Sequence, residues 1–143
     1  MSSREHTWTQ RLFRWWCGSR RGAGDELGAT GEREAERFLT GRGYQAIGRN
    51  LRFRAGEIDL LMLAPDEKTI VIVEVKSRSG SHGVYTPEAA ITRDKQATLR
   101  RLAGQVRSAN GWKDRPIRID VVAVELSRDG HQEVRHHEAA VRA

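Results

Sequence analysis

This sequence of 143 residues has a single cysteine and no long apolar stretch. Cys17 is its only cysteine, which excludes a disulfide framework and a cysteine-based zinc site and fits a reducing compartment. No apolar run approaches the roughly 20 residues of a membrane span, and the basic N-terminus lacks the apolar core of a signal peptide. We therefore expect no integral membrane segment and a cytoplasmic location.

Signature sequences of several enzyme classes are missing as well. There is no glycine-rich phosphate loop, no Gly-x-Ser-x-Gly and no His-Glu-x-x-His. What is present is basic charge: 25 Lys and Arg face 19 Asp and Glu, a formal net charge of +6. Such an excess favours a polyanionic partner, either a nucleic acid or an anionic membrane. The length leaves room for one domain with a real core.

Residues 1–26 differ from the rest and are predicted to form a basic, tryptophan-rich extension to a single domain over 27–143. They hold three of the four tryptophans, Trp8, Trp15 and Trp16, together with five arginines. The tryptophans and Leu12 would share one helix face, as in an interfacial helix or a nucleic-acid-contacting arm. Short isolated helices are marginal in water, so we favour a mobile extension.

Two charged residues interrupt the most apolar stretch of the chain. The β-branched run Ile70–Val73 predicts a strand buried on both faces. Glu74 and Lys76 follow it two residues apart, so their side chains leave the same face of the strand. Desolvating charges there costs several kcal/mol unless they are paired or bind a metal.

The preceding predicted strand, Ile58–Leu63, carries a further acid. Asp59 lies within its apolar part, which favours Asp59 over Glu57 as a site residue. Period-2 alternation places Asp59 on the face of Leu61 and places Ile58 with Leu60 on the other. A hairpin-length turn joins the two strands. Adjacent strands would thus bring two carboxylates and one ammonium to a candidate metal site.

A helix is predicted on each side of these strands. In the first, over 28–42, Glu32 points along the buried stripe; a role at the site and simple stabilisation by the helix dipole both remain open. The second is predicted to open at Thr86 or Pro87 and to run through Lys95 to about Ser108, with Lys95 on its inward side. Arg93, Arg100 and Arg107 form a row beside the buried stripe, for which a solvated face is the default and phosphate contact the alternative.

The C-terminal part reads as a core strand over 117–124 followed by a polar edge strand over 131–137. His136 and His137 are adjacent, so in a strand they would face opposite ways and could not chelate one ion together. We expect both at the surface.

In combination these residues resemble the PD-(D/E)xK nuclease superfamily, with Asp59 followed by Glu74-Val75-Lys76, and more specifically the YraN-like family of small, largely uncharacterised bacterial proteins. A lone Glu-x-Lys is a weak signal. The match covers about residues 28–138, and Ile58 replaces the usual proline. The matching residues are Gly31-Glu32 with Ala35, Arg49-Asn50, Gly56 to Leu60, Val73 to Arg78, Lys95-Gln96 and Arg118 to Val122.

The resemblance implies an α/β, restriction-endonuclease-like core with a mixed central β-sheet flanked by α-helices, similar to archaeal Holliday-junction resolvases. It implies Mg²⁺ or Mn²⁺ held by Asp59 and Glu74, with the Val75 carbonyl as a further ligand. Glu32 resembles the glutamate that resolvase-like members place on their first helix. Lys76 would orient or deprotonate the attacking water.

The resemblance also implies contact with nucleic acid, most readily DNA, by Lys95 and Gln96. Arg78, Arg93 and Arg100 are further candidates for that contact, and a homodimer is an expected assembly. The first hypothesis is a Mg²⁺-dependent endonuclease, with branched or structured DNA among its substrates. The alternatives are a non-catalytic nucleic-acid-binding module with the same fold, and a membrane- or partner-docking protein acting through the N-terminal arm.

Overall fold

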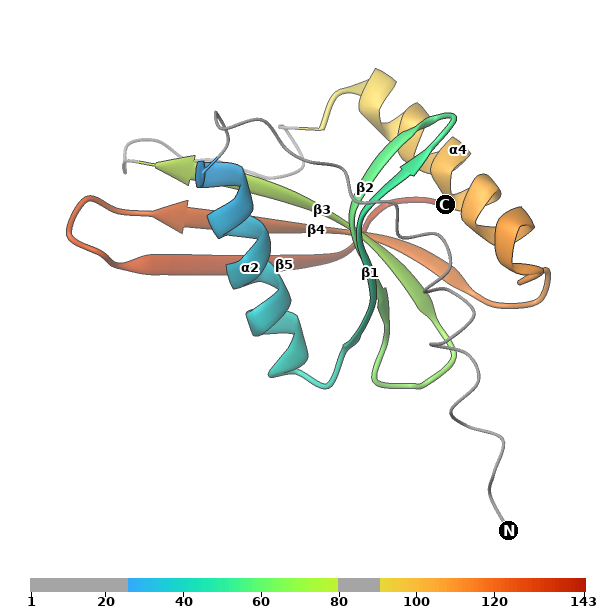
Figure 1. The fold of residues 1–143 in the computed structure, drawn as a ribbon, viewed down its shortest axis with the longest axis horizontal. Coiled ribbons are helices and arrows are strands. Elements are labelled where there is room, and N and C mark those ends of the chain that lie inside the picture. Colours follow the sequence, from blue (N-terminus) through green and yellow to red (C-terminus); the bar gives the residue numbers. More distant parts are fainter. Residues whose placement is uncertain (1–25, 80–90) are drawn as a thin grey trace, which may run out of the picture.

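The computed structural model describes residues 26–79 and 91–143, so the tryptophan-rich segment lies outside the described residues except for Glu26. Within these ranges the chain forms two helices and five strands, drawn in Figure 1. The helices are α2 (Glu26–Thr40) and α4 (Arg93–Asn110), and the strands are β1 (Gln45–Phe53), β2 (Gly56–Leu63), β3 (Ile70–Ser79), β4 (Ile117–Leu126) and β5 (Gln132–Val141). None of the described helices is long and apolar enough to cross a membrane.

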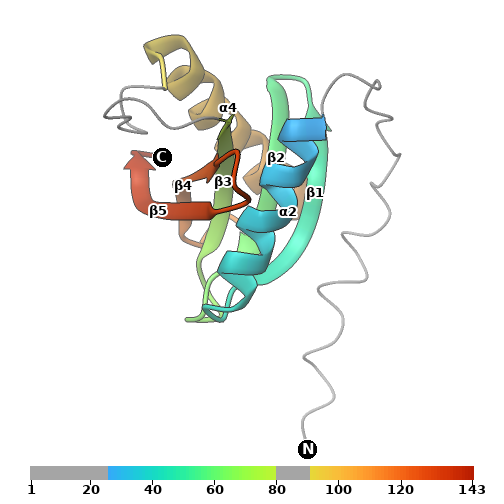
Figure 2. The same ribbon diagram turned by 90° about the vertical axis from the view of Figure 1, so that its left-hand side faces the viewer.

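The five strands form one mixed sheet in the order β1-β2-β3-β4-β5. β3 and β4 are parallel, and the other neighbouring pairs are antiparallel. Helices α2 and α4 cover opposite faces of this sheet (Figures 1 and 2). The predicted α/β architecture, a mixed central sheet flanked by helices, is confirmed.

Two apolar cores, one under each helix, follow from the alternation of side chains along β3. Ile70 and Ile72 pack in the core under α4, whereas Val71 and Val73 pack in the core under α2. All four are at most 1% exposed, as expected for a strand buried on both faces. Glu74 and Lys76 continue the series of Ile70 and Ile72, so they leave the sheet on the α4 side.

The ends of α4 are fixed by its own sequence. The Thr92 hydroxyl accepts a hydrogen bond from the Lys95 backbone N–H at 3.2 Å and caps the N-terminus. Gly111, at a φ of 66°, ends the helix in the left-handed conformation. Lys95 therefore lies in the first turn of α4.

The tip of the β1–β2 hairpin rests on α4. The Ala55 backbone N–H donates to Oε1 of Gln105 at 3.0 Å. Ile58 was predicted on the face of Leu60, and this is wrong, because Ile58 packs with Leu61 in the core under α4. The reason is that β2 is paired with β3 only from Leu60 onwards, and its first residues twist with β1 towards α4.

Candidate active site

The candidate site lies where β2 and β3 separate. The last residue pair between the two strands is Leu60 with Val73. Asp59 and Glu74 are the next residues on either strand, and Glu74 leaves on the α4 side, where it meets Lys95. The Val75 backbone N–H, which has no β2 partner at this point, donates to Oδ2 of Asp59 at 2.9 Å. Divergence of the strands thus makes room for a pair of carboxylates at the centre of the sheet.

Glu74 is a buried acid with two cations. It is 4% exposed, and its Oε1 lies 3.2 Å from the ammonium nitrogen of Lys76 and 3.2 Å from that of Lys95. Lys76 comes from the same face of β3, and Lys95 comes from the first turn of α4. Both lysine side chains are about one-third exposed, so their ammonium groups line the boundary between the core and solvent. Burial of Glu74 is compatible with folding because it is paired.

The electrostatics of Asp59 differ from those of an ordinary aspartate. Burial raises the pKa of Asp59 to about 7, and the negative charge of Glu74 adds to the rise. The hydrogen bond from Val75 opposes the rise, Glu32 adds to it, and Lys95 lowers it. The Asp59 carboxyl is therefore partly protonated near neutral pH, and a bound cation would favour its charged form.

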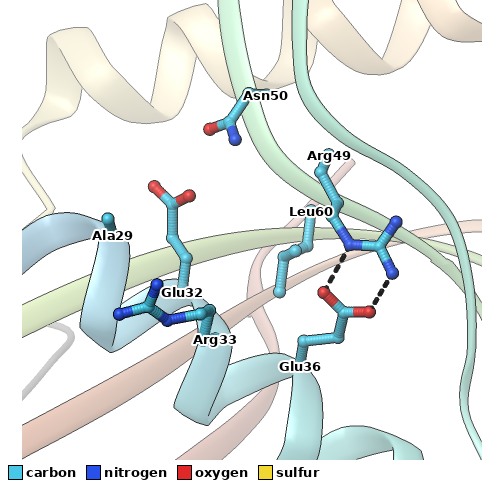
Figure 3. A pocket seen from close by; sticks show the side chains of 7 residues that line it. All are labelled: Ala29, Glu32, Arg33, Glu36, Arg49, Asn50 and Leu60. Carbon is cyan, nitrogen blue, oxygen red and sulfur yellow. Dashed lines mark hydrogen bonds and ion pairs between the residues drawn. The ribbon is translucent and has the colours of Figure 1, made fainter. Parts of the chain in front are cut away.

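Glu32 approaches the site from the other layer. It lies on α2 and is close enough to Asp59 to raise the pKa of that carboxyl. Figure 3 shows the side chains of Glu32, from α2, and Asn50, from β1, pointing into one pocket of about 170 Å³. An ion pair between Arg49 and Glu36 closes one side of it. The pocket is lined by Ala29, Glu32, Arg33, Glu36, Arg49, Asn50 and Leu60.

A close approach of α2 to β3 brings Glu32 to this position. A Cβ built on Gly31 would lie 1.6 Å from Oγ and 2.8 Å from Cβ of Ser77. Only glycine fits there, because any side chain would push the helix away from the strand. Gly31 was noted in the sequence only as part of the family resemblance, and its partner Ser77 is distant in sequence.

The donor set at the site fits a hard divalent cation. Asp59 and Glu74 supply carboxylate oxygens, and Mg²⁺ in proteins uses one or two carboxylates and keeps several waters. The Val75 carbonyl leaves the strand on the same edge as its N–H, which points to Asp59. Among residues 26–79 and 91–143, no three His, Cys, Asp or Glu side chains form a ready metal cluster. The part of Glu32 as a ligand stays a prediction.

The predicted nucleic-acid contacts divide into two groups. Lys95 joins the site through Glu74. The side chains of Gln96 and Arg100 instead donate to backbone carbonyls, those of Ile91 and Arg142. Arg93 and Arg78 are exposed. Contact of these five residues with nucleic acid stays a prediction.

A second polar cluster lies under α2 and was missed in the sequence. Asp120 is fully buried and accepts two hydrogen bonds of 2.8 Å from the Arg118 guanidinium. The His136 ring bonds the same carboxylate at 2.8 Å, and the backbone N–H of Ala139 donates to it at 2.9 Å. The expectation that His136 lies at the surface is wrong, since its side chain is only 2% exposed. Asp120 lies at the irregularity in the β4–β5 register, so this cluster anchors β5.

Comparisons with known proteins place the sequence in a family without an assigned activity. The sequence model of the uncharacterised protein family UPF0102 matches residues 31–124. A UPF0102 protein of Symbiobacterium thermophilum is 47% identical over 104 residues, which are 73% of this chain and 86% of that protein. One of Beutenbergia cavernae is 46% identical over 114 residues, 80% of this chain and 94% of the relative.

Among solved structures, a repair endonuclease from Pyrococcus abyssi is similar at a TM-score of 0.43 and 18% identity. The likeness covers 79% of this chain, which spans only 42% of the length of that endonuclease. At this identity and TM-score the similarity assigns neither an activity nor a substrate to this chain.

Proposed function

This chain belongs to the uncharacterised protein family UPF0102, and we propose that it is a metal-dependent nuclease that hydrolyses phosphodiester bonds of DNA. The observation that carries the proposal is the convergence of Asp59, Glu74 and Lys76. The first two meet where β2 and β3 separate, and the ammonium of Lys76 lies 3.2 Å from Glu74. Two carboxylates that can hold a metal ion, beside a fixed cation, are the groups that metal-assisted phosphodiester hydrolysis requires.

The charge balance of the site supports a divalent cation and an anionic substrate together. The three carboxylates of Asp59, Glu74 and Glu32 outnumber the two ammonium groups of Lys76 and Lys95 by one. Near neutral pH a proton on Asp59 offsets that excess, because the pKa of Asp59 is raised to about 7. When the proton is replaced by a doubly charged ion, the site gains one net positive charge, which a phosphodiester neutralises.

Each side chain then has a defined part. Asp59 and Glu74 would hold Mg²⁺ or Mn²⁺, which supplies a coordinated water of lowered pKa and neutralises charge on the phosphate. Lys76, held by Glu74 as an ammonium group, orients the attacking water and stabilises the charge that develops on the phosphoryl oxygens. Lys95 keeps the Glu74 carboxylate in position from the α4 side.

DNA is proposed as the substrate on the basis of the net charge of +6 and the resemblance to junction resolvases, which also puts branched DNA among the candidates. The test is cleavage of a panel of single-stranded, flapped, nicked and four-way-junction DNA with Mg²⁺ or Mn²⁺. Wild-type protein should cut at least one of these. Asp59→Asn, Glu74→Gln and Lys76→Met should lose at least about a hundredfold in rate.

Glu57→Gln is the matched control for the acid variants, because Glu57 lies on the same strand as Asp59 and contacts Arg52 at 3.8 Å. It should cleave like the wild type. Binding of DNA without cleavage under every metal and substrate would replace the proposal with a non-catalytic nucleic-acid-binding module.

A further inference from the structure

A shallow groove of about 750 Å³ lies between α4 and the tip of the β1–β2 hairpin, apart from the candidate active site. Its walls are joined by the hydrogen bond from the Ala55 N–H to Gln105, and they lie close together at Gly56, where an added Cβ would come within 3.2 Å of Cγ2 of Thr98. It is therefore a fixed feature of the fold. The lining residues are Phe53, Arg54, Arg101, Gly104, Gln105, Ser108 and Ala109.

The groove is positively charged. Arg54 and Arg101 are exposed, and no acid is among the lining residues. Arg101 donates to the hydroxyl of Thr98 at 3.2 Å, and within the described ranges neither arginine forms an ion pair with a carboxylate. Gly104 leaves the floor open, since a Cβ added there meets nothing within 4 Å. Two guanidinium groups beside an open floor suit a phosphate backbone.

The groove and the active site lie on the same helix. Lys95 contacts Glu74 in the first turn of α4, and Arg101 and Gln105 follow six and ten residues later. A rise of 1.5 Å per residue puts them about 9 Å and about 15 Å along the axis from Lys95. Phosphates on one DNA strand advance about 3.4 Å per base pair, so these distances correspond to about three to four base pairs.

We propose that this groove binds the phosphate backbone of the DNA arm that flanks the scissile phosphodiester. The inference rests on the proposed function of the site, and it assigns to Arg54 and Arg101 a binding role that the sequence did not indicate. Arg54 and Arg101 act as phosphate contacts. They touch no reacting atom, so they should affect binding rather than the chemical step.

The test is equilibrium binding of duplex DNA in Ca²⁺, and separately without divalent metal, over a range of salt concentrations. Arg54→Gln/Arg101→Gln should weaken binding about tenfold or more at low salt and lower the slope of log K against log salt by about two. Arg128→Gln, in the exposed β4–β5 turn at the opposite end of Figure 1 from α4, is the control for lost charge and should stay near the wild type.

Gly104 offers a second, matched pair of variants. Gly104→Gln and Gly104→Glu have side chains of the same size, both fit the open floor, and both favour the helix over glycine. The glutamate variant should bind DNA at least about tenfold more weakly than the glutamine variant at low salt. Equal unfolding midpoints for the two would show that the loss is electrostatic.

The outcomes separate this inference from the proposed function. If the wild type binds and cleaves DNA, but the arginine variant binds as tightly as Arg128→Gln, the groove assignment is overturned and the nuclease proposal stands. If binding depends on the groove and no cleavage occurs, the groove assignment stands alone. If the wild type binds no duplex DNA in either condition, the groove assignment is overturned.

Discussion

Lys95, on α4, and Lys76, on β3, contact the same oxygen atom of Glu74, each at 3.2 Å. The two lysines come from different layers of the fold, and the carboxylate between them is only 5% exposed. Helix α4 is thus tied to the point at which β2 and β3 separate. The pairing makes Lys76 and Lys95 partly redundant as counter-ions of Glu74, although only Lys76 is proposed to act on the water.

The redundancy predicts different effects on rate and on stability. Lys76→Met should lower the cleavage rate by about 10²–10³-fold, whereas Lys95→Met should lower it roughly tenfold, because Glu74 loses only one of its two cations. Each single variant should cost roughly 1 kcal/mol in the free energy of unfolding. The double variant leaves a buried charge unpaired and should cost about 3–5 kcal/mol, more than the sum. Denaturant titration of all four proteins measures this coupling, and strict additivity would contradict it.

The raised pKa of Asp59 predicts a dependence of stability on pH without metal. The folded-state pKa, about 7, lies above the unfolded value of about 3.9. Between these values the folded state binds the extra proton, so stability falls as pH rises, by at most about 1.4 kcal/mol per pH unit for one proton. Asp59→Asn removes this slope and should be more stable than the wild type at pH 8.

Metal provides the second half of that experiment. Mg²⁺ should stabilise the wild type at pH 8 more than at pH 6, because it competes with the proton on Asp59. Asp59→Asn should show little metal stabilisation at either pH. A wild-type unfolding curve that does not respond to Mg²⁺ at pH 8 would argue against Asp59 as a ligand.

The contact between Gly31 and Ser77 predicts a complementary pair of substitutions. Gly31→Ala puts a methyl group within 2.8 Å of the Ser77 Cβ, so α2 must move away from β3. The expected loss is about 1–3 kcal/mol, even though alanine favours the helix. Cleavage should also fall, because Glu32 is the next residue on α2.

Ser77→Gly removes the atoms with which that methyl group would collide. The double variant Gly31→Ala/Ser77→Gly should therefore recover part of the stability lost in Gly31→Ala, beyond what Ser77→Gly costs by itself. If the serine substitution has the same effect in both backgrounds, the two residues do not constrain each other.

The Asp120 cluster predicts a purely structural effect. Burial would raise the pKa of Asp120, but the hydrogen bonds from His136, Arg118 and the Ala139 N–H outweigh it and hold the pKa below its ordinary value. Asp120→Asn should cost roughly 3–5 kcal/mol, because Arg118 and His136 lose a charged partner.

The same shift fixes the pH dependence of that loss. Because the folded-state pKa is depressed, the stabilisation is complete above the unfolded value of about 3.9 and is lost as pH falls through the folded value. The difference between the wild type and Asp120→Asn should therefore be constant near neutral pH and shrink below about pH 4. A difference that grows in acid would contradict this sign.

Local patterns were sufficient to predict the core of the candidate site. Glu74 and Lys76 interrupt a β-branched run, and Asp59 lies in the neighbouring strand. The shared face of Glu74 and Lys76 follows from the period of 2 residues with which side chains alternate in a strand. The inward side of Lys95 follows from the period of 3.6 residues of a helix. The helix and strand ranges followed in the same way, with small differences at their ends, except at α4. It was predicted to open at Thr86 or Pro87, which lie outside the described residues, but α4 begins at Arg93 after its cap Thr92.

The contacts that the sequence did not predict join residues far apart in the chain. His136 lies in a polar segment typical of an exposed edge strand, and only the fold brings Asp120 beside it. The Ala55–Gln105 bond likewise depends on the twist that carries the hairpin to α4. Twist and register accumulate over a whole sheet, and residue periods alone do not fix them.

Cleavage of the best DNA substrate, measured while Mg²⁺ is titrated into chelator-treated protein, tests the central claim most directly. We expect no cleavage in chelator, a rate that rises and saturates with Mg²⁺, and no recovery in Asp59→Asn or Glu74→Gln at any Mg²⁺ concentration. Cleavage that persists in chelator, or that both variants catalyse as fast as the wild type, would contradict the proposed site.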